Sequence, residues 1–411
     1  MTHPALDLAA DHPFGIHNLP YGVFDHGGHA RVGVRLGDHV LDLCSIPGAE
    51  FADAWAQDTL NTFLAMGRAA WQSARAWLTD LLTDDGERAT VEEHLVPLSD
   101  VMLRLPFRVG DYVDFYASEH HATNVGKIFR PDSEALTPNW KHLPIGYHGR
   151  SSTVVVSGTD IVRPSGQRKP PTESSPVFGP SVRLDIEAEL GFVVGGAQTE
   201  LGRPVALAEA HEHLFGVVLL NDWSARDIQA WEYVPLGPFL GKSFATSISP
   251  WVVTMDALAA ARVPLPGQDP EPLPYLRGEP TADGASTAYG LDITYEVDWN
   301  GTVVSRPPYR TMYWSPAQML AHMTVNGAIT GPGDLFGSGT ISGPEKDQRG
   351  SFLELSWSGQ EPVRLEDGSE RTFLEDGDTV TLRATAPSPD GSVIGLGECT
   401  GTIVSCQRNS D

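Results

Sequence analysis

The strictest pattern in the chain is the segment 184–190, Leu-Asp-Ile-Glu-Ala-Glu-Leu, in which apolar and acidic residues alternate without exception. This alternation has the period of a β-strand. A strand here places Asp185, Glu187 and Glu189 on one face and the four apolar side chains on the other. The segment therefore predicts a strand with a face of three carboxylates.

That acidic face has two interpretations. On a protein as acidic as this one, it could simply be a solvated surface. However, carboxylates about 7 Å apart along one strand repel each other, and a bound divalent cation would turn that repulsion into attraction. Asp222 and the Asp111/Asp114 pair could complete an all-oxygen site of the kind that Ca²⁺ or Mg²⁺ prefers, although the sequence does not show that these residues meet.

The rest of the chain predicts short strands and many turns. It holds 42 glycines and 32 prolines among 411 residues, which favours turns over long helices. Residues 21–43 alternate around a Gly-Gly turn, as short antiparallel strands do, and 62–82 is the best amphipathic helix. Further strands are expected at 154–156, 181–194, 215–220, 291–297, 350–356 and 379–384. A composition shift at 97–107 suggests a boundary between two domains.

Charge and cysteine content limit the function classes. The formal net charge is −25 and the pI is near 4.8, and such an acidic surface repels phosphate backbones and anionic lipid. We therefore expect no nucleic-acid and no membrane partner. Cys44, Cys399 and Cys406 lack Cys-x-x-Cys spacing, which indicates neither a disulfide framework nor a zinc knuckle. The first residues do not resemble a signal peptide and the apolar runs are too short to span a bilayer, which favours a soluble protein of the cytoplasm.

A second informative stretch, 221–246, follows an apolar run that is typical of a buried strand. Its first dozen residues hold more ionisable and aromatic groups than a simple connection needs, which suggests a site: Asp222, Arg226, Asp227, Gln229, Trp231, Glu232 and Tyr233. Within it, 237–243 is not a P-loop, because three residues rather than four separate its glycines. The glycine-rich segment 337–343 offers backbone amides that suit a carboxylate, with a tight turn as the equal alternative.

Two pairs of histidines are candidates for catalysis or metal binding. His121 is better placed than its neighbour His120, because Asp, Tyr, Asn and Arg residues surround it in the sequence. A general base needs such neighbours to set its tautomer. His211 and His213 superficially resemble a zinc pair, but with no third ligand nearby a structural role is the better interpretation.

Six stretches together resemble the fumarylacetoacetate hydrolase family. They are 111–116 (Asp-Tyr-Val-Asp-Phe-Tyr), 121–126 (His-Ala-Thr-Asn-Val-Gly), 144–150 (Pro-Ile-Gly-Tyr-His-Gly-Arg), 221–243, 338–343 (Ser-Gly-Thr-Ile-Ser-Gly) and 353–357 (Leu-Glu-Leu-Ser-Trp). The resemblance covers nearly the whole chain, more weakly before residue 100. The chain departs from the family pattern at 119–120 and in the loop 264–289.

The resemblance implies a mainly β protein of the α+β type. A small SH3-like barrel would occupy 1–110 and a larger mixed β-roll catalytic domain would occupy 111–411, in a cytoplasmic homodimer. The implied activity is metal-dependent hydrolysis of the carbon–carbon bond of 4-fumarylacetoacetate, a small diketo-dicarboxylate, to fumarate and acetoacetate. This is the last step of tyrosine and phenylalanine catabolism. The implied cofactor is a divalent cation, Ca²⁺ or Mg²⁺.

The resemblance also implies roles for individual residues. The metal ligands fall on Asp114, Glu187, Glu189 and Asp222, with Lys242 and Thr246 around a second cation. The base falls on His121, oriented by Glu354, and Arg226, Gln229 and Lys242 would support developing negative charge. The substrate contacts fall on Tyr116, Arg130, Tyr147, Arg226, Gln229, Tyr233 and Thr340.

Two other functions are alternatives. A metal-dependent hydratase or decarboxylase of oxo acids, from the same superfamily, would share the carboxylates but would need no His–Glu pair to activate water. A Ca²⁺-stabilised β-rich binding module would use the carboxylates only to hold its loops. His121 with Glu354, and the additional N-terminal domain, favour the hydrolase.

Overall fold

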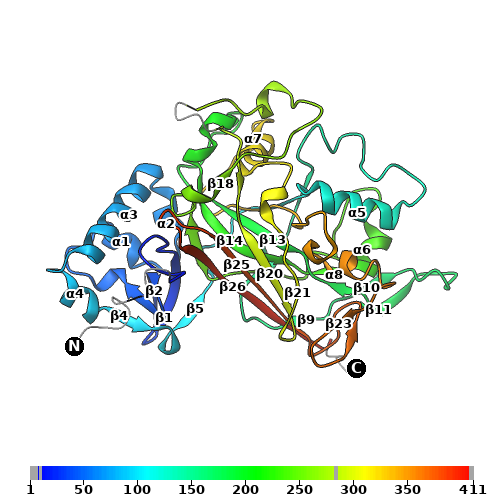
Figure 1. Ribbon diagram of the computed structural model, residues 1–411, viewed down its shortest axis with the longest axis horizontal. Helices are drawn as coiled ribbons and strands as arrows, with labels where there is room; N and C mark the ends of the chain where they lie inside the picture. Colours follow the sequence, from blue (N-terminus) through cyan, green and yellow to red (C-terminus); the bar gives the residue numbers. More distant parts are fainter. Residues whose placement is uncertain (1–7, 9–11, 282–285, 407–411) are drawn as a thin grey trace.

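The computed structural model describes residues 8, 12–281 and 286–406, and it is mostly β-structure with short helices (Figure 1). The expectation about the first residues of the chain, and part of the expected loop 264–289, fall outside this range. Within the described part, no helix combines the length and the apolar character needed to cross a bilayer. Cys44, Cys399 and Cys406 are all free thiols, as their spacing predicted.

A sheet of 13 strands extends through the molecule, and most of its strands follow the order β4-β3-β2-β1-β17-β14-β13-β22-β6-β7. Along that order the strands are β4 (Leu95–Pro97), β3 (His39–Asp42), β2 (His29–Leu36), β1 (Tyr21–His26), β17 (Trp251–Thr254), β14 (Leu214–Asp222), β13 (Ala188–Val194), β22 (Leu335–Gly337), β6 (Tyr112–Phe115) and β7 (Gly146–His148). Beside them, β5 (Met102–Arg104) pairs with β1, and β16 (Thr246–Ile248) pairs with β14 and β8 (Val154–Val156).

A second sheet of five strands packs alongside the large one, in the order β21-β20-β25-β26-β9 (Figure 1). Its strands are β21 (Thr302–Ser305), β20 (Thr294–Trp299), β25 (Thr379–Pro387), β26 (Val393–Val404) and β9 (Ile161–Val162). Short two-stranded pieces are β10 (Ser165–Arg168) with β11 (Val177–Pro180), β12 (Leu184–Asp185) with β15 (Ser224–Ala225), β18 (Arg262–Val263) with β19 (Gly290–Leu291), and β23 (Val363–Arg364) with β24 (Glu370–Arg371).

Most of the described helices are short, as the glycine and proline content predicted, but α3 (Arg68–Thr83) has 16 residues. The others are α1 (Ala52–Trp55), α2 (Asn61–Ala65), α4 (Arg88–Glu93), α5 (Glu119–Phe129), α6 (Arg226–Glu232), α7 (Pro316–Thr324) and α8 (Phe352–Leu355). The expected helix 62–82 is therefore two helices. Gly67 separates them because it takes a φ of +82°, outside the helical region and favourable only for glycine.

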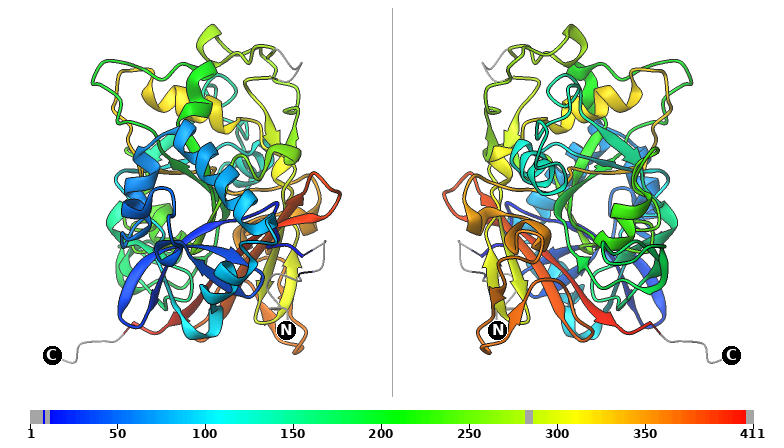
Figure 2. Two further views of the ribbon diagram at one scale, coloured as in Figure 1. Left: turned by 90° about the vertical axis from the view of Figure 1, so that its left-hand side faces the viewer. Right: turned by 90° about the vertical axis from the view of Figure 1, so that its right-hand side faces the viewer.

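The N-terminal strands join the large sheet directly. Strand β1 pairs antiparallel with β17, with Tyr21 opposite Val252 and Gly22 opposite Trp251. In the left view of Figure 2 the N-terminal strands and helices face the viewer, in front of the green strands of the sheet. Strand β14 lies behind them with all nine of its residues buried, because Phe215 packs against the N-terminal aromatic residues and Leu219 belongs to the larger hydrophobic core. A strand covered on both faces explains the continuous apolar run.

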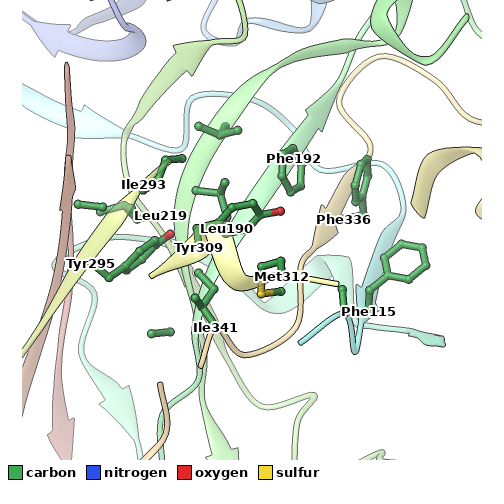
Figure 3. Close-up of a cluster of buried hydrophobic side chains, with 14 of the residues drawn as sticks. Phe115, Leu190, Phe192, Leu219, Ile293, Tyr295, Tyr309, Met312, Phe336 and Ile341 are labelled. Carbon is green, nitrogen blue, oxygen red and sulfur yellow. The ribbon is translucent and has the colours of Figure 1, made fainter. Parts of the chain in front are cut away.

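The apolar face of segment 184–190 is part of the larger core. Leu184, Ile186, Ala188 and Leu190 are fully buried. Figure 3 shows Leu190 and Phe192 of β13 among side chains from β6, β14, β20 and β22. Phe192 stacks on Phe336 with ring centroids 5.1 Å apart. This packing holds β13 and β22 rigidly behind the carboxylates on the opposite face.

Three expected strands need correction. The strand 291–297 is interrupted at residues 292–293, between β19 and β20. The strand 181–194 is interrupted at residues 186–187 between β12 and β13. The segment 350–356 contains the short helix α8 rather than a strand. Its N-cap Ser351 accepts a hydrogen bond from the amide of Glu354, and short apolar runs do not distinguish strand from helix by periodicity alone.

Candidate active site

Four carboxylates meet on the part of the large sheet formed by β14, β13 and β6. Asp114 lies on β6, Glu189 on β13, Asp222 at the end of β14, and Glu187 just before β13. All four are buried, and each offers a ligand atom within 4.8 Å of the others. The hypothesis of a solvated acidic face is therefore wrong, and this group is called the carboxylate cluster below.

Strand β22 separates β13 from β6 and leaves room for the cluster through Gly337. Gly337 is in register with Asp114 on one side and Gly191 on the other. A Cβ atom at Gly337 would lie 2.7 Å from Oε2 of Glu189 and 2.9 Å from Oδ1 of Asp114. The missing side chain thus creates the space in which these carboxylates face each other.

The cluster has the chemistry of a cation site. Oδ1 of Asp114 and Oε1 of Glu189 are buried oxygens without a hydrogen-bond partner in the described part of the chain. Burial, and then the charges of neighbouring carboxylates, raise the pKa of Asp114 and of Glu189. Unpaired buried carboxylate oxygens are costly unless a cation binds them. The residues therefore fit an oxygen-ligated divalent cation.

Two of the acidic residues considered from the sequence lie outside the cluster. Asp111 is exposed. Asp185 is fully buried, but its carboxylate accepts hydrogen bonds from the amides of Phe352 and Leu353 and from Nε of Arg226 at 2.7 Å. Because the strand is interrupted after Asp185, this side chain does not continue the face of Glu187 and Glu189.

Lys242 and Thr246 border the cluster on one side. Nζ of Lys242 donates to Glu187 and, at 2.7 Å, to Asp222. Although burial lowers the pKa of Lys242, these carboxylates raise it above its ordinary value. A protonated amine has no lone pair for a metal, so in this state Lys242 acts on the cluster through its charge. Thr246 donates to Oδ1 of Asp222 at 3.1 Å.

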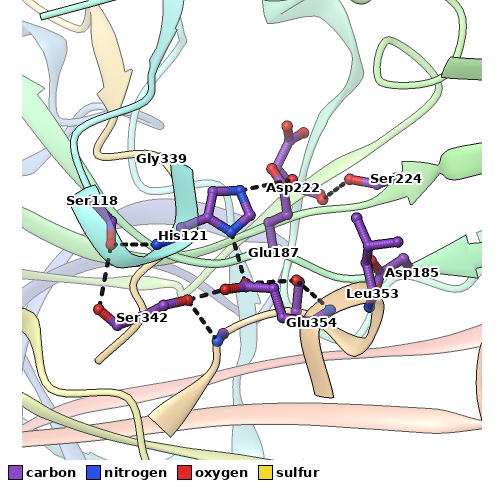
Figure 4. A network of polar contacts seen from close by, with 12 residues as sticks. Ser118, His121, Asp185, Glu187, Asp222, Ser224, Gly339, Ser342, Leu353 and Glu354 are labelled. Carbon is purple, nitrogen blue, oxygen red and sulfur yellow. Dashed lines mark hydrogen bonds and ion pairs between the residues drawn. The ribbon is translucent and has the colours of Figure 1, made fainter. Parts of the chain in front are cut away.

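His121 lies between the cluster and Glu354 (Figure 4). Its Nδ1 is 2.7 Å from Oε2 of Glu354, and its Nε2 is 4.0 Å from Oε1 of Glu187. A carboxylate at Nδ1 favours the proton on that nitrogen and leaves the Nε2 lone pair free to accept another. Burial raises the pKa of Glu354, but His121 and the surrounding hydrogen bonds lower it below its ordinary value. The pair is therefore arranged as a base and its orienting carboxylate.

Arg226 forms the start of α6 and faces the same region. Its Nε donates to Asp185, and its Nη1 donates to Glu187 at 2.7 Å and to Gln229 at 3.1 Å. Its buried Nη2 has no partner among the described residues. One donor of a fixed guanidinium is thus left for a ligand oxygen.

Part of this group of residues lines one cavity of about 450 Å³. All residues proposed as substrate contacts lie on its wall: Tyr116, Arg130, Tyr147, Arg226, Gln229, Tyr233 and Thr340. Asp114, His121, Glu187 and Lys242 also line it. Oγ1 of Thr340 is buried without a partner in the described structure. The wall combines apolar side chains with a few convergent polar groups, as small-molecule sites do.

The other candidates from the sequence, His211, His213 and the segment 337–343, make contacts within the protein itself. His211 is exposed beside Glu212, and Nδ1 of His213 lies 3.3 Å from the carbonyl of Gly195. Neither belongs to a possible metal site among the described residues. In the glycine-rich segment, the amide of Gly339 binds a carboxylate at 3.1 Å, but it is the protein's own Glu189. The sequence interpretation gave no role to Asn124, Ser342 or Ser351, whose contacts with Glu354 appear only in the folded chain.

Cation affinity should fall as the pH falls. The raised pKa values of Asp114 and Glu189 mean that, without a cation, these groups hold protons where ordinary carboxyls have lost them. A cation must displace these protons, so binding is strongest above the raised pKa values and is lost below them. Calorimetric titrations with Mg²⁺, Ca²⁺ and Mn²⁺ in buffers of different ionisation enthalpy measure the released protons. Affinity independent of pH, without proton release, contradicts this expectation.

Both parts of the chain match models of known protein families. Residues 17–106 match the model of the fumarylacetoacetase N-terminal domain, and residues 112–404 match that of the fumarylacetoacetate hydrolase C-terminal domain. Fumarylacetoacetase of Homo sapiens is 48% identical, covering 97% of this chain and 98% of the relative. That of Arabidopsis thaliana is also 48% identical, covering 97% of each.

Solved structures share the fold at low sequence identity. Fumarylacetoacetate hydrolase from Exiguobacterium antarcticum is 18% identical with a TM-score of 0.55, covering 94% of this chain and all of that one. Maleylpyruvate hydrolase from Sphingobium, solved with manganese(II) and pyruvate, is 16% identical with a TM-score of 0.50, covering 95% of this chain and all of that one. The two family models and the full-length relatives decide the assignment: the chain belongs to the fumarylacetoacetate hydrolase family.

Proposed function

We propose that this chain hydrolyses 4-fumarylacetoacetate to fumarate and acetoacetate, the last step of tyrosine and phenylalanine catabolism. The observation that carries the proposal is that Asp114 and Glu187 of the carboxylate cluster line one cavity together with His121 and Arg226, while Glu354 holds His121 from behind. Near-identical length and 48% identity to human and plant fumarylacetoacetases support this substrate.

Asp114, Glu187, Glu189 and Asp222 would hold a divalent cation, and we favour Ca²⁺ or Mg²⁺ because all donors are oxygens. When bound, the cation supplies Lewis-acid polarisation of the diketone oxygens. A second cation is proposed to bind next to Thr246 and Lys242. Calcium and magnesium titrations of the protein stripped with a chelator distinguish one site from two.

His121 is the proposed general base. With the proton of its imidazole on Nδ1 toward Glu354, Nε2 can take a proton from water. The hydroxide adds to the ketone carbon of the fumaryl group, and the bond from this carbon to the acetoacetyl methylene breaks. The methylene carbon leaves with the electron pair as an enolate and then receives a proton. Glu354 stabilises the imidazolium that exists between the two proton transfers.

Charged and polar groups on the cavity wall are proposed to stabilise the negative charge of the substrate and of the reacting oxygen. Arg226, with a free Nη2, Gln229 and Lys242 are proposed to stabilise the oxygen that becomes negative. Arg130, Tyr147 and Thr340 are proposed to hold a substrate carboxylate, and Tyr116 and Tyr233 to contact the carbon chain. These donors give an acidic protein the local positive charge that an anionic substrate needs.

The direct test is to add the purified protein to fumarylacetoacetate and follow the loss of its absorbance. Equal amounts of fumarate and acetoacetate should appear. Hydration or decarboxylation products would favour the oxo-acid hydratase or decarboxylase, and unchanged substrate with retained cation binding would favour a binding module.

No covalent acyl-enzyme should form, because His121 lies beside the cluster rather than beside a serine or cysteine nucleophile. A single turnover in ¹⁸O-water should place one ¹⁸O in fumarate and none in peptides of the protein. Mass spectrometry of both measures this. A fumaryl adduct, or label in a peptide containing Glu187, would show that a side chain attacks the substrate instead of water.

We further propose that residues 1–110 form an SH3-like barrel, that 111–411 form a catalytic domain with a mixed β-roll, and that the protein is a cytoplasmic homodimer. Strands β1 to β5 and helices α1 to α4 all precede residue 105, which supports the first part. The family-model matches, which change between residues 106 and 112, support the boundary. Sedimentation of the purified protein tests the dimer.

A further inference from the structure

The two oxygens of the Glu354 carboxylate are held very differently. Oε2 accepts hydrogen bonds from Nδ1 of His121 at 2.7 Å and from Oγ of Ser342 at 3.0 Å (Figure 4). It also accepts one from Oγ of Ser351 at 2.8 Å. Oε1 accepts one, from Nδ2 of Asn124 at 2.9 Å. Glu354 is fully buried, so Asn124 is the only described side chain that satisfies this second oxygen.

Helix α5 presents two of the four side-chain donors to this carboxylate. His121 and Asn124 are three residues apart, so they lie on the same face of the helix. The start of α5 is fixed by Ser118, whose side chain accepts a hydrogen bond from the amide of His121 and donates to the carbonyl of Ser342. One rigid helix therefore donates to Oε2 through His121 and to Oε1 through Asn124.

We propose that Asn124 is a positioning residue that fixes the rotation of the Glu354 carboxylate, and through it the orientation and tautomer of His121. Asn124 does not line the substrate cavity, and it is not part of the carboxylate cluster. It can therefore act on the reaction only through Glu354. This inference rests on the proposed function for its kinetic test, but not for its spectroscopic test.

The physical reason is the cost of an unpaired buried oxygen. Without the amide of Asn124, Oε1 keeps its charge in a dry environment without a donor. The carboxylate then turns toward the remaining donors, Ser342 and Ser351, or admits water, and either change loosens its hydrogen bond to Nδ1 of His121. Because the Glu354 hydrogen bond sets which nitrogen of His121 is free, a loosened carboxylate lowers the fraction of His121 ready to accept a proton.

Two substitutions of similar volume separate a donor role from a packing role. Asn124→Leu keeps the number of side-chain heavy atoms and favours the helix but donates no hydrogen bond, and it should lower kcat about 10- to 100-fold, the range known for residues that hydrogen-bond to metal ligands. Asn124→Asp keeps the shape but places a second carboxylate against Glu354, and at pH 8 it should lower kcat further. If Asn124 only filled space, both variants would remain close to wild type.

Matched measurements identify the route of the effect. KM and the affinity for Mg²⁺ should change less than about threefold in either variant, because Asn124 touches neither cavity nor cluster. Thr123→Ala is the control, since Thr123 is a half-buried neighbour on α5 whose side chain makes no hydrogen bond among the described residues. In a protein that already carries Glu354→Gln, Asn124→Leu should lower kcat little further, because the effects of residues that act through one another are non-additive.

NMR of protein labelled with ¹⁵N-histidine gives a readout that needs no substrate. Wild type should show His121 as the Nδ1-protonated tautomer, and Asn124→Leu and Asn124→Asp should shift its two nitrogen resonances while Thr123→Ala should not. An unchanged His121 spectrum, or a full additional loss of kcat in the Glu354→Gln background, overturns the proposal. If the wild-type protein does not act on fumarylacetoacetate, the proposed reaction is rejected. The NMR spectra then decide by themselves whether Asn124 positions Glu354 and His121.

Discussion

Asp114→Asn should abolish turnover of fumarylacetoacetate and cation binding together. Asparagine keeps the shape of the side chain but removes one of four negative charges, and its amide group points donors or a weaker oxygen at the space beside Glu189. Asp114 lies on β6 in register with Gly337, so neighbouring carboxylates cannot move in to replace it. The loss should exceed the roughly 10- to 100-fold that follows when a residue only hydrogen-bonds to a metal ligand.

Asp111→Asn is the matched control for this variant. Asp111 precedes the same strand and carries the same charge, but it is exposed and outside the cluster. It should retain turnover and cation affinity. Measuring kcat, calorimetric affinity for Mg²⁺ or Ca²⁺ and thermal stability on both variants completes the comparison. Full activity of Asp114→Asn, or of wild type after thorough chelation, would remove the cation from the proposed reaction.

His121→Asn should lower kcat by about 10²- to 10⁴-fold, the usual effect of losing a general base. Glu354→Gln should also lower it, because a neutral amide neither stabilises the imidazolium nor fixes the Nδ1–H tautomer. The double variant should be scarcely worse than His121→Asn, because both changes disable the same proton transfer. Steady-state kinetics on the four proteins measure the interaction, and cation affinity should remain in all of them.

His120→Asn is the control on the same helix. His120 precedes His121 but does not line the cavity, so its replacement should leave kcat within about threefold of wild type. If the losses from His121→Asn and Glu354→Gln instead multiply, Glu354 has a separate task. The hydrogen bond of 2.7 Å would then be a structural contact rather than part of the base.

Part of the carboxylate site follows from local sequence, because side-chain direction along a strand has a period of two. The alternation of 184–190 determined that Glu187 and Glu189 point away from the core that Ala188 and Leu190 enter, and the structure agrees. The apolar run before Asp222 determined a buried strand, which is now β14. The same pattern placed Asp185 beside them, and there it failed, because the strand breaks after Asp185 and its carboxylate binds α8 and Arg226.

The assembly of the site was decided only by tertiary structure. The order β13-β22-β6 brings Asp114 and Glu189 together across Gly337, and strand order depends on contacts between segments far apart in the chain. His121 and Glu354 are separated by 233 residues, and no periodicity connects them; family resemblance suggested the pair, and packing of α5 against α8 brings it to 2.7 Å. Local sequence determined which side chains share a face, while burial of the two sheets' apolar faces decided which faces meet.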